Sequence, residues 1–148
     1  MASARSWRSN SRMPEPFRHR IRVRYGECDA QSIVFNAHYF AYFDLALTEL
    51  YREAFGSYQS MLDRGIDLVV GEANAHFRAP ARFDDELDLE VTVTRLGTTG
   101  ITTRYDVLRD GELLVVGELR HVVVSLGTHE KTPIPDWLRE GLGRFAGL

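Results

Sequence analysis

The sequence predicts an α+β domain in which a five-stranded antiparallel sheet wraps around one long helix. Three observations favour this arrangement. Residues 37–55 carry an apolar arc too wide for a helix that lies on a surface. Residues 17–25 and 87–94 alternate apolar and polar side chains, as half-buried strands do. Asp110-Gly111 favours a two-residue hairpin turn, so the strands on either side of it are expected to pair antiparallel.

The long helix is predicted to begin after Asn36 and to end at Gly56. Asn36 is a suitable N-cap because its side-chain oxygen can accept a hydrogen bond from an N–H group of the first turn. Gly56 suits the position after the last turn because glycine adopts a left-handed conformation without steric strain. Most side chains between them are apolar, and the polar ones form one stripe made of Asp44, Thr48, Glu49, Arg52 and Glu53.

Three further strands are predicted over residues 66–79, 101–108 and 113–126, followed by a short amphipathic helix over 136–145. One face of segment 66–79 carries small side chains, which suits a close approach of the long helix. Segment 113–126 is apolar on both faces, so we expect it inside the sheet or under a partner chain. The four strands after the helix are expected to follow one another as an antiparallel meander.

The first strand, residues 17–25, has an apolar face and a face with four arginines. We interpret the arginines as a solvent-facing surface, and a patch that binds ligand phosphates is the alternative. Tyr25 belongs to the apolar face, so its ring is expected to point toward the helix.

Composition bounds the class of protein. The 148 residues suffice for one domain, predicted over 17–148, and residues 1–16 are Ser- and Arg-rich, which is typical of a disordered tail. A net charge of −3 argues against nucleic-acid binding, and no apolar run is long enough to cross a membrane. The single cysteine excludes a disulfide framework and favours a reducing compartment, so we expect a cytoplasmic protein.

Residues 25–39 contain the motif Tyr-x-x-x-Asp-x-x-x-Ile-Val-Phe-x-x-x-Tyr, and Thr48-Glu49 follow on the helix. This pattern resembles the hot-dog-fold acyl-CoA thioesterases, in particular the 4-hydroxybenzoyl-CoA thioesterase-like family. The resemblance continues through residues 78–87 and 134–138. It implies hydrolysis of an acyl-CoA or acyl-carrier-protein thioester, without a metal or a cofactor other than coenzyme A as part of the substrate. It also implies a site between two protomers, in a homodimer or a homotetramer.

The resemblance assigns the chemistry to Asp29, as the nucleophile that attacks the thioester or the base that activates water. N–H groups at the start of the helix would polarise the thioester carbonyl. Asn36 would orient a water molecule or the carbonyl, and Tyr25 would bring its ring toward Asp29. The residues expected to line the substrate site are Ser32, Ile33, Val34, Phe35, His38 and Tyr39.

Two positions depart from the family pattern. Ser32 stands where many relatives have a glycine, and Asn36 stands where thioesterases of this branch often have a histidine. Asparagine cannot carry a proton at neutral pH. His38, two positions further, cannot take over that role, because two helical residues are about 200° apart around the axis. We interpret His38 as a structural or pocket-lining residue of the first turn.

Other readings of these residues stay open. Asp29 alone would equally suit a cap of the turn, and a non-catalytic acyl-thioester-binding hot-dog protein is the alternative function. A Cys28 nucleophile is disfavoured because no base is paired with it, and a hot-dog dehydratase is disfavoured because its histidine-led motif is absent. Glu49 and Glu53 belong to the polar stripe of the helix, which favours a solvent or interface face for them.

Overall fold

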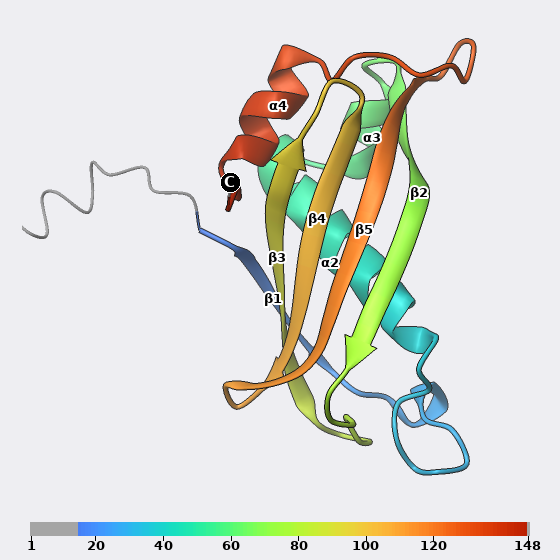
Figure 1. Ribbon diagram of the computed structural model, residues 1–148, viewed down its shortest axis with the longest axis vertical. Helices are drawn as coiled ribbons and strands as arrows, with labels where there is room; N and C mark the ends of the chain where they lie inside the picture. The colour runs from blue at the N-terminus through green and yellow to red at the C-terminus, as the bar shows by residue number, and fades with distance from the viewer. Residues whose placement is uncertain (1–14, 148) are drawn as a thin grey trace, which may run out of the picture.

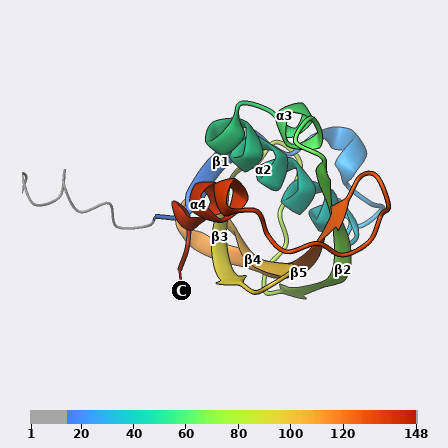
Figure 2. The same cartoon turned by 90° about the horizontal axis from the view of Figure 1, so that it is seen from above.

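The computed structural model describes residues 15–147, in which one curved antiparallel sheet packs around a central helix. The sheet has five strands in the order β1-β3-β4-β5-β2. The helix α2 lies against its concave face (Figure 1, Figure 2). This is the hot-dog arrangement that the sequence predicts. The strand bounds are β1 Phe17–Arg22, β2 Ile66–Phe77, β3 Glu86–Leu96, β4 Gly100–Arg109 and β5 Glu112–Ser125.

The predicted meander of four strands is wrong in one respect. Strands β3, β4 and β5 do follow one another, but β2 pairs with β5 and forms the far edge of the sheet. Residues 78–85 therefore cross from one side of the sheet toward the other. Eight extended residues reach about 26 Å, enough to pass two strands spaced ~4.8 Å apart. Strand patterns alone do not distinguish this crossing from a hairpin.

Helix α2, His38–Phe55, supplies much of the core. Tyr42, Phe43 and Leu50 are fully buried against the sheet. Gly56 ends the helix with φ 88° and donates its N–H to the carbonyl of Arg52, as predicted.

The predicted N-cap is wrong. Ala37 is the residue that precedes the first turn, and its φ and ψ of −67° and −20° are already helical. No side chain caps this end of the helix. Asn36 instead accepts the N–H of Tyr39 with its backbone carbonyl, at 3.3 Å. Asn36 therefore stabilises the helix start through its backbone, and its side chain is exposed.

A glycine of β5, Gly117, makes room for a ring of helix α2, whereas the small residues of β2 only partly face the core. A Cβ atom at Gly117 would overlap ring atoms of Phe43. The same ring stacks on Tyr105 with the ring centroids 4.8 Å apart, so it has no free space to move into. Ala73 of β2, predicted to face the helix, is exposed, and Gly71 lies at a bulge in the β2–β5 pairing.

The arginines of β1 face outward as predicted, but carboxylates of β3 neutralise them. Arg18 pairs with Glu90, and Arg20 pairs with Asp88 at 3.0 Å. Arg22 likewise pairs with Glu86, at 3.1 Å. Exposed ion pairs contribute only about 0–1 kcal/mol each. Their consequence is a nearly neutral surface, which does not favour the phosphate-binding alternative.

Two short helices complete the fold. Helix α3, Tyr58–Leu62, connects α2 to β2, and α4, Asp136–Gly143, covers the end of β3. Within residues 15–147 no helix is long and apolar enough to cross a membrane. Residues 1–14 of the predicted tail lie outside the described residues.

We expect Gly117→Ala to destabilise the protein by about 1–3 kcal/mol, the usual cost of overpacking a core. The new methyl group would displace the ring of Phe43 from Tyr105. Gly143→Ala is the matched control because a Cβ there meets no atom within 4 Å. Urea unfolding of both variants measures the difference, and equal stability would contradict the close packing described for Gly117.

Candidate active site

The loop that carries Asp29 is closed at its base by backbone hydrogen bonds. Phe35 donates its N–H to the carbonyl of Glu27 at 3.0 Å, and Cys28 forms a β-bridge with Val34. Inside this closure Asp29 donates its N–H to Ile33 at 2.9 Å. The loop joins η1, the 3-10 turn Tyr25–Glu27, to the start of α2. Asp29 is therefore held beside the N-terminus of the central helix.

Ser32 adopts a left-handed conformation with φ 65°. This conformation costs an L-residue about 1–2 kcal/mol and glycine nothing. The loop thus keeps the backbone shape that suits the glycine of relatives, although serine occupies the position.

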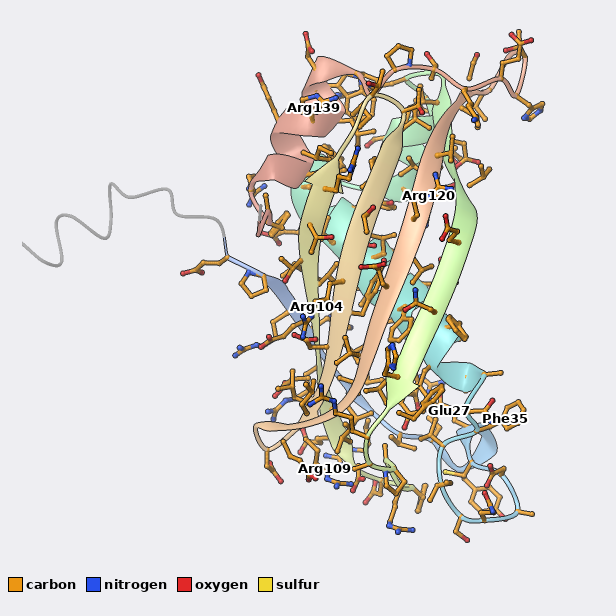
Figure 3. The ribbon with its side chains drawn as sticks, viewed as in Figure 1. Glu27, Phe35, Arg104, Arg109, Arg120 and Arg139 are labelled. Atoms are coloured by element: carbon orange, nitrogen blue, oxygen red, sulfur yellow. The ribbon has the colours of Figure 1, made fainter. Side chains whose placement is uncertain are left out.

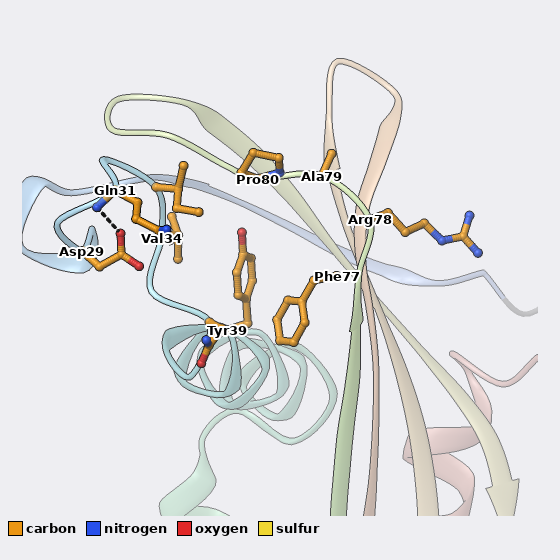
Figure 4. A pocket seen from close by; sticks show the side chains of 10 residues that line it. Asp29, Gln31, Val34, Tyr39, Phe77, Arg78, Ala79 and Pro80 are labelled. Atoms are coloured by element: carbon orange, nitrogen blue, oxygen red, sulfur yellow. Dashed lines mark hydrogen bonds between the residues drawn. The ribbon is translucent and has the colours of Figure 1, made fainter.

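The carboxylate of Asp29 is only partly engaged. One oxygen, Oδ1, accepts the N–H of Gln31 at 2.8 Å (Figure 4). Within residues 15–147 its other oxygen, Oδ2, has no hydrogen-bond partner. The side chain is half-buried and borders a pocket of about 280 Å³. Asp29 thus caps a turn with one oxygen and presents the other to the pocket.

Two backbone N–H groups just before α2 are free, and one of them belongs to Asn36, which lines the same pocket as Asp29. The N–H groups of His38, Tyr39 and Phe40 are used locally, at 2.8, 3.3 and 3.2 Å from the carbonyls three residues earlier. The backbone N–H groups of Asn36 and Ala37 have no acceptor in the part of the chain that the structure describes. These groups and the helix dipole favour negative charge at this point. A developing oxyanion in the pocket would meet donors that are already in place.

The pocket is mostly apolar, and two segments of the chain line it. The loop and α2 contribute Ile33, Val34 and Tyr39, and the end of β2 contributes Phe77 opposite Tyr39 (Figure 4). The ring centroids of Tyr39 and Phe77 are 5.6 Å apart. Arg78 follows at the rim with its guanidinium directed away from the pocket. The remaining lining residues are Asp29, Gln31, Asn36, Ala79 and Pro80.

The structure brings five of the predicted site residues together at this pocket: Asp29, Ile33, Val34, Asn36 and Tyr39. Ser32 lies outside it, at a neighbouring hollow that Asp29 also borders. Phe35 is half exposed and points outward (Figure 3). His38 faces the opposite side, toward Glu27.

The predicted orientation of Tyr25 is wrong. Strand β1 ends at Arg22, and Tyr25 belongs to η1. The reversal of direction there leaves the Tyr25 side chain 81% exposed, with its ring edge-on to Phe83 at 6.0 Å. The alternation over 17–25 continues three residues beyond the true strand, and the sequence pattern does not mark the turn that follows.

Glu27 was not predicted from the sequence as a site residue, but it connects the loop that carries Asp29 to α2. Its Oε1 accepts the N–H of Arg24 and the hydroxyl of Tyr42, both at 2.8 Å. Its Oε2 lies 3.3 Å from Nε2 of His38. Partial burial raises the pKa of Glu27, but the hydrogen bonds from Arg24 and Tyr42 outweigh it and hold the pKa below its ordinary value. The carboxylate is therefore charged at neutral pH.

Phe77 and the residues after it were missed as well. The strand pattern placed Phe77 on the face toward the helix but gave no sign that it borders the Asp29 loop. No group of three or more His, Cys, Asp or Glu side chains suited to a metal ion occurs among residues 15–147.

Comparison with known proteins agrees with the fold. A family model described as the thioesterase-like superfamily matches residues 23–142. The chain belongs to this superfamily. The acyl-CoA thioester hydrolase YbgC of Escherichia coli O6:H1 is 33% identical over 110 residues, 74% of this chain and 82% of that protein. The 1,4-dihydroxy-2-naphthoyl-CoA hydrolase of Synechococcus elongatus is 25% identical over 126 residues, 81% of this chain and 90% of that protein.

Solved structures of similar proteins have the same architecture. A protein from Aquifex aeolicus superposes with a TM-score of 0.82 at 29% identity, covering 86% of this chain and 99% of its own. A protein from Thermus thermophilus superposes with a TM-score of 0.80 at 30% identity, covering 86% of this chain and 98% of its own. The superfamily assignment thus agrees with the fold over most of the described residues.

We expect Glu27→Ala to destabilise the protein by about 1–3 kcal/mol, because the hydroxyl of Tyr42 would lose its acceptor in a buried setting. Tyr42→Phe is the matched partner variant. In a double-mutant cycle the second substitution should cost much less than it does alone. Additive effects in chemical unfolding would show that the two groups do not interact.

The contribution of Glu27 to the free energy of unfolding should depend on pH. Its pKa is lower in the folded than in the unfolded chain, where it is about 4.3. The stabilisation is therefore fully present above that value and is lost as the pH falls through the folded pKa. The stability difference between wild type and Glu27→Gln should be constant above about pH 5 and shrink in more acidic buffer. A difference that grows on acidification would contradict this account.

Proposed function

We propose that this protein hydrolyses an acyl-CoA thioester to a free acid and coenzyme A, with Asp29 as nucleophile or general base. One observation carries the proposal: Asp29, with one free carboxylate oxygen, and Asn36, whose backbone N–H has no acceptor within residues 15–147, line a single apolar pocket. The relatives named acyl-CoA thioester hydrolase and 1,4-dihydroxy-2-naphthoyl-CoA hydrolase support the substrate class. An acyl-carrier-protein thioester has the same reacting group and is the close alternative.

The reaction needs a nucleophile at the carbonyl carbon and donors at the carbonyl oxygen. As a base, Asp29 takes a proton from a water molecule whose oxygen attacks the carbon. As a nucleophile, its oxygen attacks directly, and water then hydrolyses the resulting anhydride. In both cases the carbonyl oxygen becomes negative while the N–H groups at the start of α2 donate to it. Collapse breaks the carbon–sulfur bond and releases the thiolate of coenzyme A, which takes up a proton.

The surroundings of the pocket fit a compact or flat acyl group. Tyr39 and Phe77 form its apolar wall, and Asn36 lies at the rim where a water molecule or the carbonyl needs orientation. The chemistry uses no cofactor, because coenzyme A enters as part of the substrate. A cytoplasmic location fits a substrate of this kind and the single cysteine, Cys28.

We expect Asp29→Asn to lower turnover at least about a hundredfold while acyl-CoA binding persists, because the amide keeps the shape but loses the base or nucleophile. Asp110→Asn makes the same chemical change in the exposed β4–β5 turn and should leave turnover unchanged. Free-thiol release from a panel of acyl-CoA substrates measures both. Equal turnover of Asp29→Asn and wild type would refute the assignment. Binding without hydrolysis by the wild type would instead favour a non-catalytic acyl-thioester-binding protein.

We also propose a homodimer, or a homotetramer built from it, in which the edge strands β2 of two chains pair. β2 is 12 residues long, and its outer edge is open in the single chain. Val69, Val70 and Phe77 are exposed on it, with 55% of Val70 accessible. Long apolar edges of this kind are normally covered in native proteins. Antiparallel pairing about a two-fold axis covers both copies at once.

We expect light scattering at micromolar concentration to give at least a dimer for the wild type. Val69→Lys combined with Val70→Lys should give a folded monomer, because charged edge residues oppose strand pairing. A monomeric wild type would exclude the dimer, and a dimeric Val69→Lys/Val70→Lys variant would exclude pairing through β2.

A further inference from the structure

A second pocket lies between α2 and the β5–β2 side of the sheet, away from Asp29. It has a volume of about 340 Å³ and combines an apolar floor with several polar groups. Tyr58, at its rim, donates its hydroxyl to Asp67. The lining residues are Asp44, Leu47, Thr48, Tyr51, Tyr58, Leu68 and His121.

His121 is the unusual residue of this pocket. Its side chain comes from β5, is only 5% exposed, and has a ring nitrogen, Nδ1, without a hydrogen-bond partner anywhere in residues 15–147. A buried polar atom without a partner costs about 1–3 kcal/mol. Burial lowers the pKa of His121, and the carboxylate of Asp44 on α2 opposes this only in part. The imidazole is therefore neutral at pH 7 and offers one donor and one acceptor.

The position of this pocket along β2 limits what it can do within one chain. The Asp29 pocket borders Phe77, at the end of β2, whereas the His121 pocket borders Leu68, near its beginning. The nine residue steps from Leu68 to Phe77 span about 30 Å at ~3.3 Å per residue. One acyl group cannot reach both pockets of the same chain.

Pairing of two β2 strands changes this relation. In an antiparallel pair centred on the middle of Ile66–Phe77, the beginning of one strand lies beside the end of the other. Leu68 of one chain then lies near the end of the partner strand that carries Phe77. Both pockets lie on the helix-bearing face of the sheet, and a two-fold axis through that face keeps them on one side. Each Asp29 pocket thereby adjoins the partner's His121 pocket.

We infer that His121 of one chain forms part of the site whose Asp29 belongs to the other chain, and that it hydrogen-bonds a polar substituent on the acyl group. The inference rests on the proposed function and on the β2-paired dimer. It makes His121 a specificity-determining residue: the substrate supplies the hydrogen bond that the protein leaves open. The enzyme should then prefer acyl groups that carry a hydroxyl at the right distance from the thioester over the same acyl groups without it.

A site that hydrogen-bonds a substrate hydroxyl discriminates strongly against the analogue that lacks it, because the protein group is then left unpaired. The test uses CoA thioesters in matched pairs, with and without a hydroxyl, placed at increasing distances from the carbonyl. We expect at least one pair to differ about tenfold or more in kcat/KM with the wild type. His121→Leu should remove this difference by slowing the hydroxylated member, and His121→Gln should restore part of it.

Two controls keep this result interpretable. Thermal unfolding checks that His121→Leu is folded, which is expected because leucine suits an apolar position on β5. His129→Asn removes an exposed imidazole in the segment between β5 and α4 and should preserve the discrimination. Hydrolysis of all pairs without a hydroxyl preference, or a preference unchanged in His121→Leu, overturns the role of His121. Absence of any hydrolysis would instead overturn the proposed function.

Mixed dimers test the cross-chain arrangement. A heterodimer of one Asp29→Asn chain and one His121→Leu chain, isolated with two affinity tags, has a single intact Asp29, on the chain that lacks His121. If the site combines both chains, that Asp29 faces the intact His121, and the heterodimer recovers the hydroxyl preference. If both residues act within one chain, the preference stays absent and the cross-chain inference is wrong.

Discussion

The burial of α2 in the curved sheet is the constraint on which the rest of this structure depends. Phe43 fits between Tyr105 and the bare backbone of Gly117, which fixes the depth of the helix. With the helix fixed, its polar start must emerge at one end of the sheet. Glu27 then ties the preceding loop to the first two turns through His38 and Tyr42. A carboxylate and a residue with a free N–H group, Asp29 and Asn36, are thereby held at one pocket by packing.

Much of this could be predicted from the sequence, since local patterns define the elements. The alternation of β1 and β3, the apolar arc of α2 and the stop at Gly56 are local signals, and all were confirmed. The clustering of Asp29, Ile33, Val34, Asn36 and Tyr39 followed from their closeness in the chain. Errors arose where the direction of the chain depends on distant contacts. Tyr25 turns outward because η1 reverses the chain, and β2 pairs with β5 because residues 78–85 cross the sheet.

The residues that sequence reasoning missed share one property: their partners are distant in sequence or direction. The role of Glu27 depends on its hydrogen bond with Tyr42, and the role of Phe77 depends on the contact between its ring and that of Tyr39. In the sequence, His121 is one of several inward-facing residues of a strand. Only the structure shows that its ring nitrogen Nδ1 has no hydrogen-bond partner within residues 15–147. The sequence pattern also does not show that β2 is an edge strand, because its pairing with β5 alone depends on the crossing of residues 78–85. These features lie in or near the site that, in our proposal, two chains would complete.

A crystal structure of the Asp29→Asn variant with an intact acyl-CoA would test the central claim most directly. The account predicts the thioester in the pocket between Tyr39 and Phe77, with its carbonyl oxygen about 2.7–3.1 Å from the N–H of Asn36 or Ala37. The side chain at position 29 should lie against the carbonyl carbon, directly or through one water molecule. A thioester bound elsewhere, such as the hollow beside Tyr25 and Phe83, with its carbonyl away from the start of α2, would contradict the account.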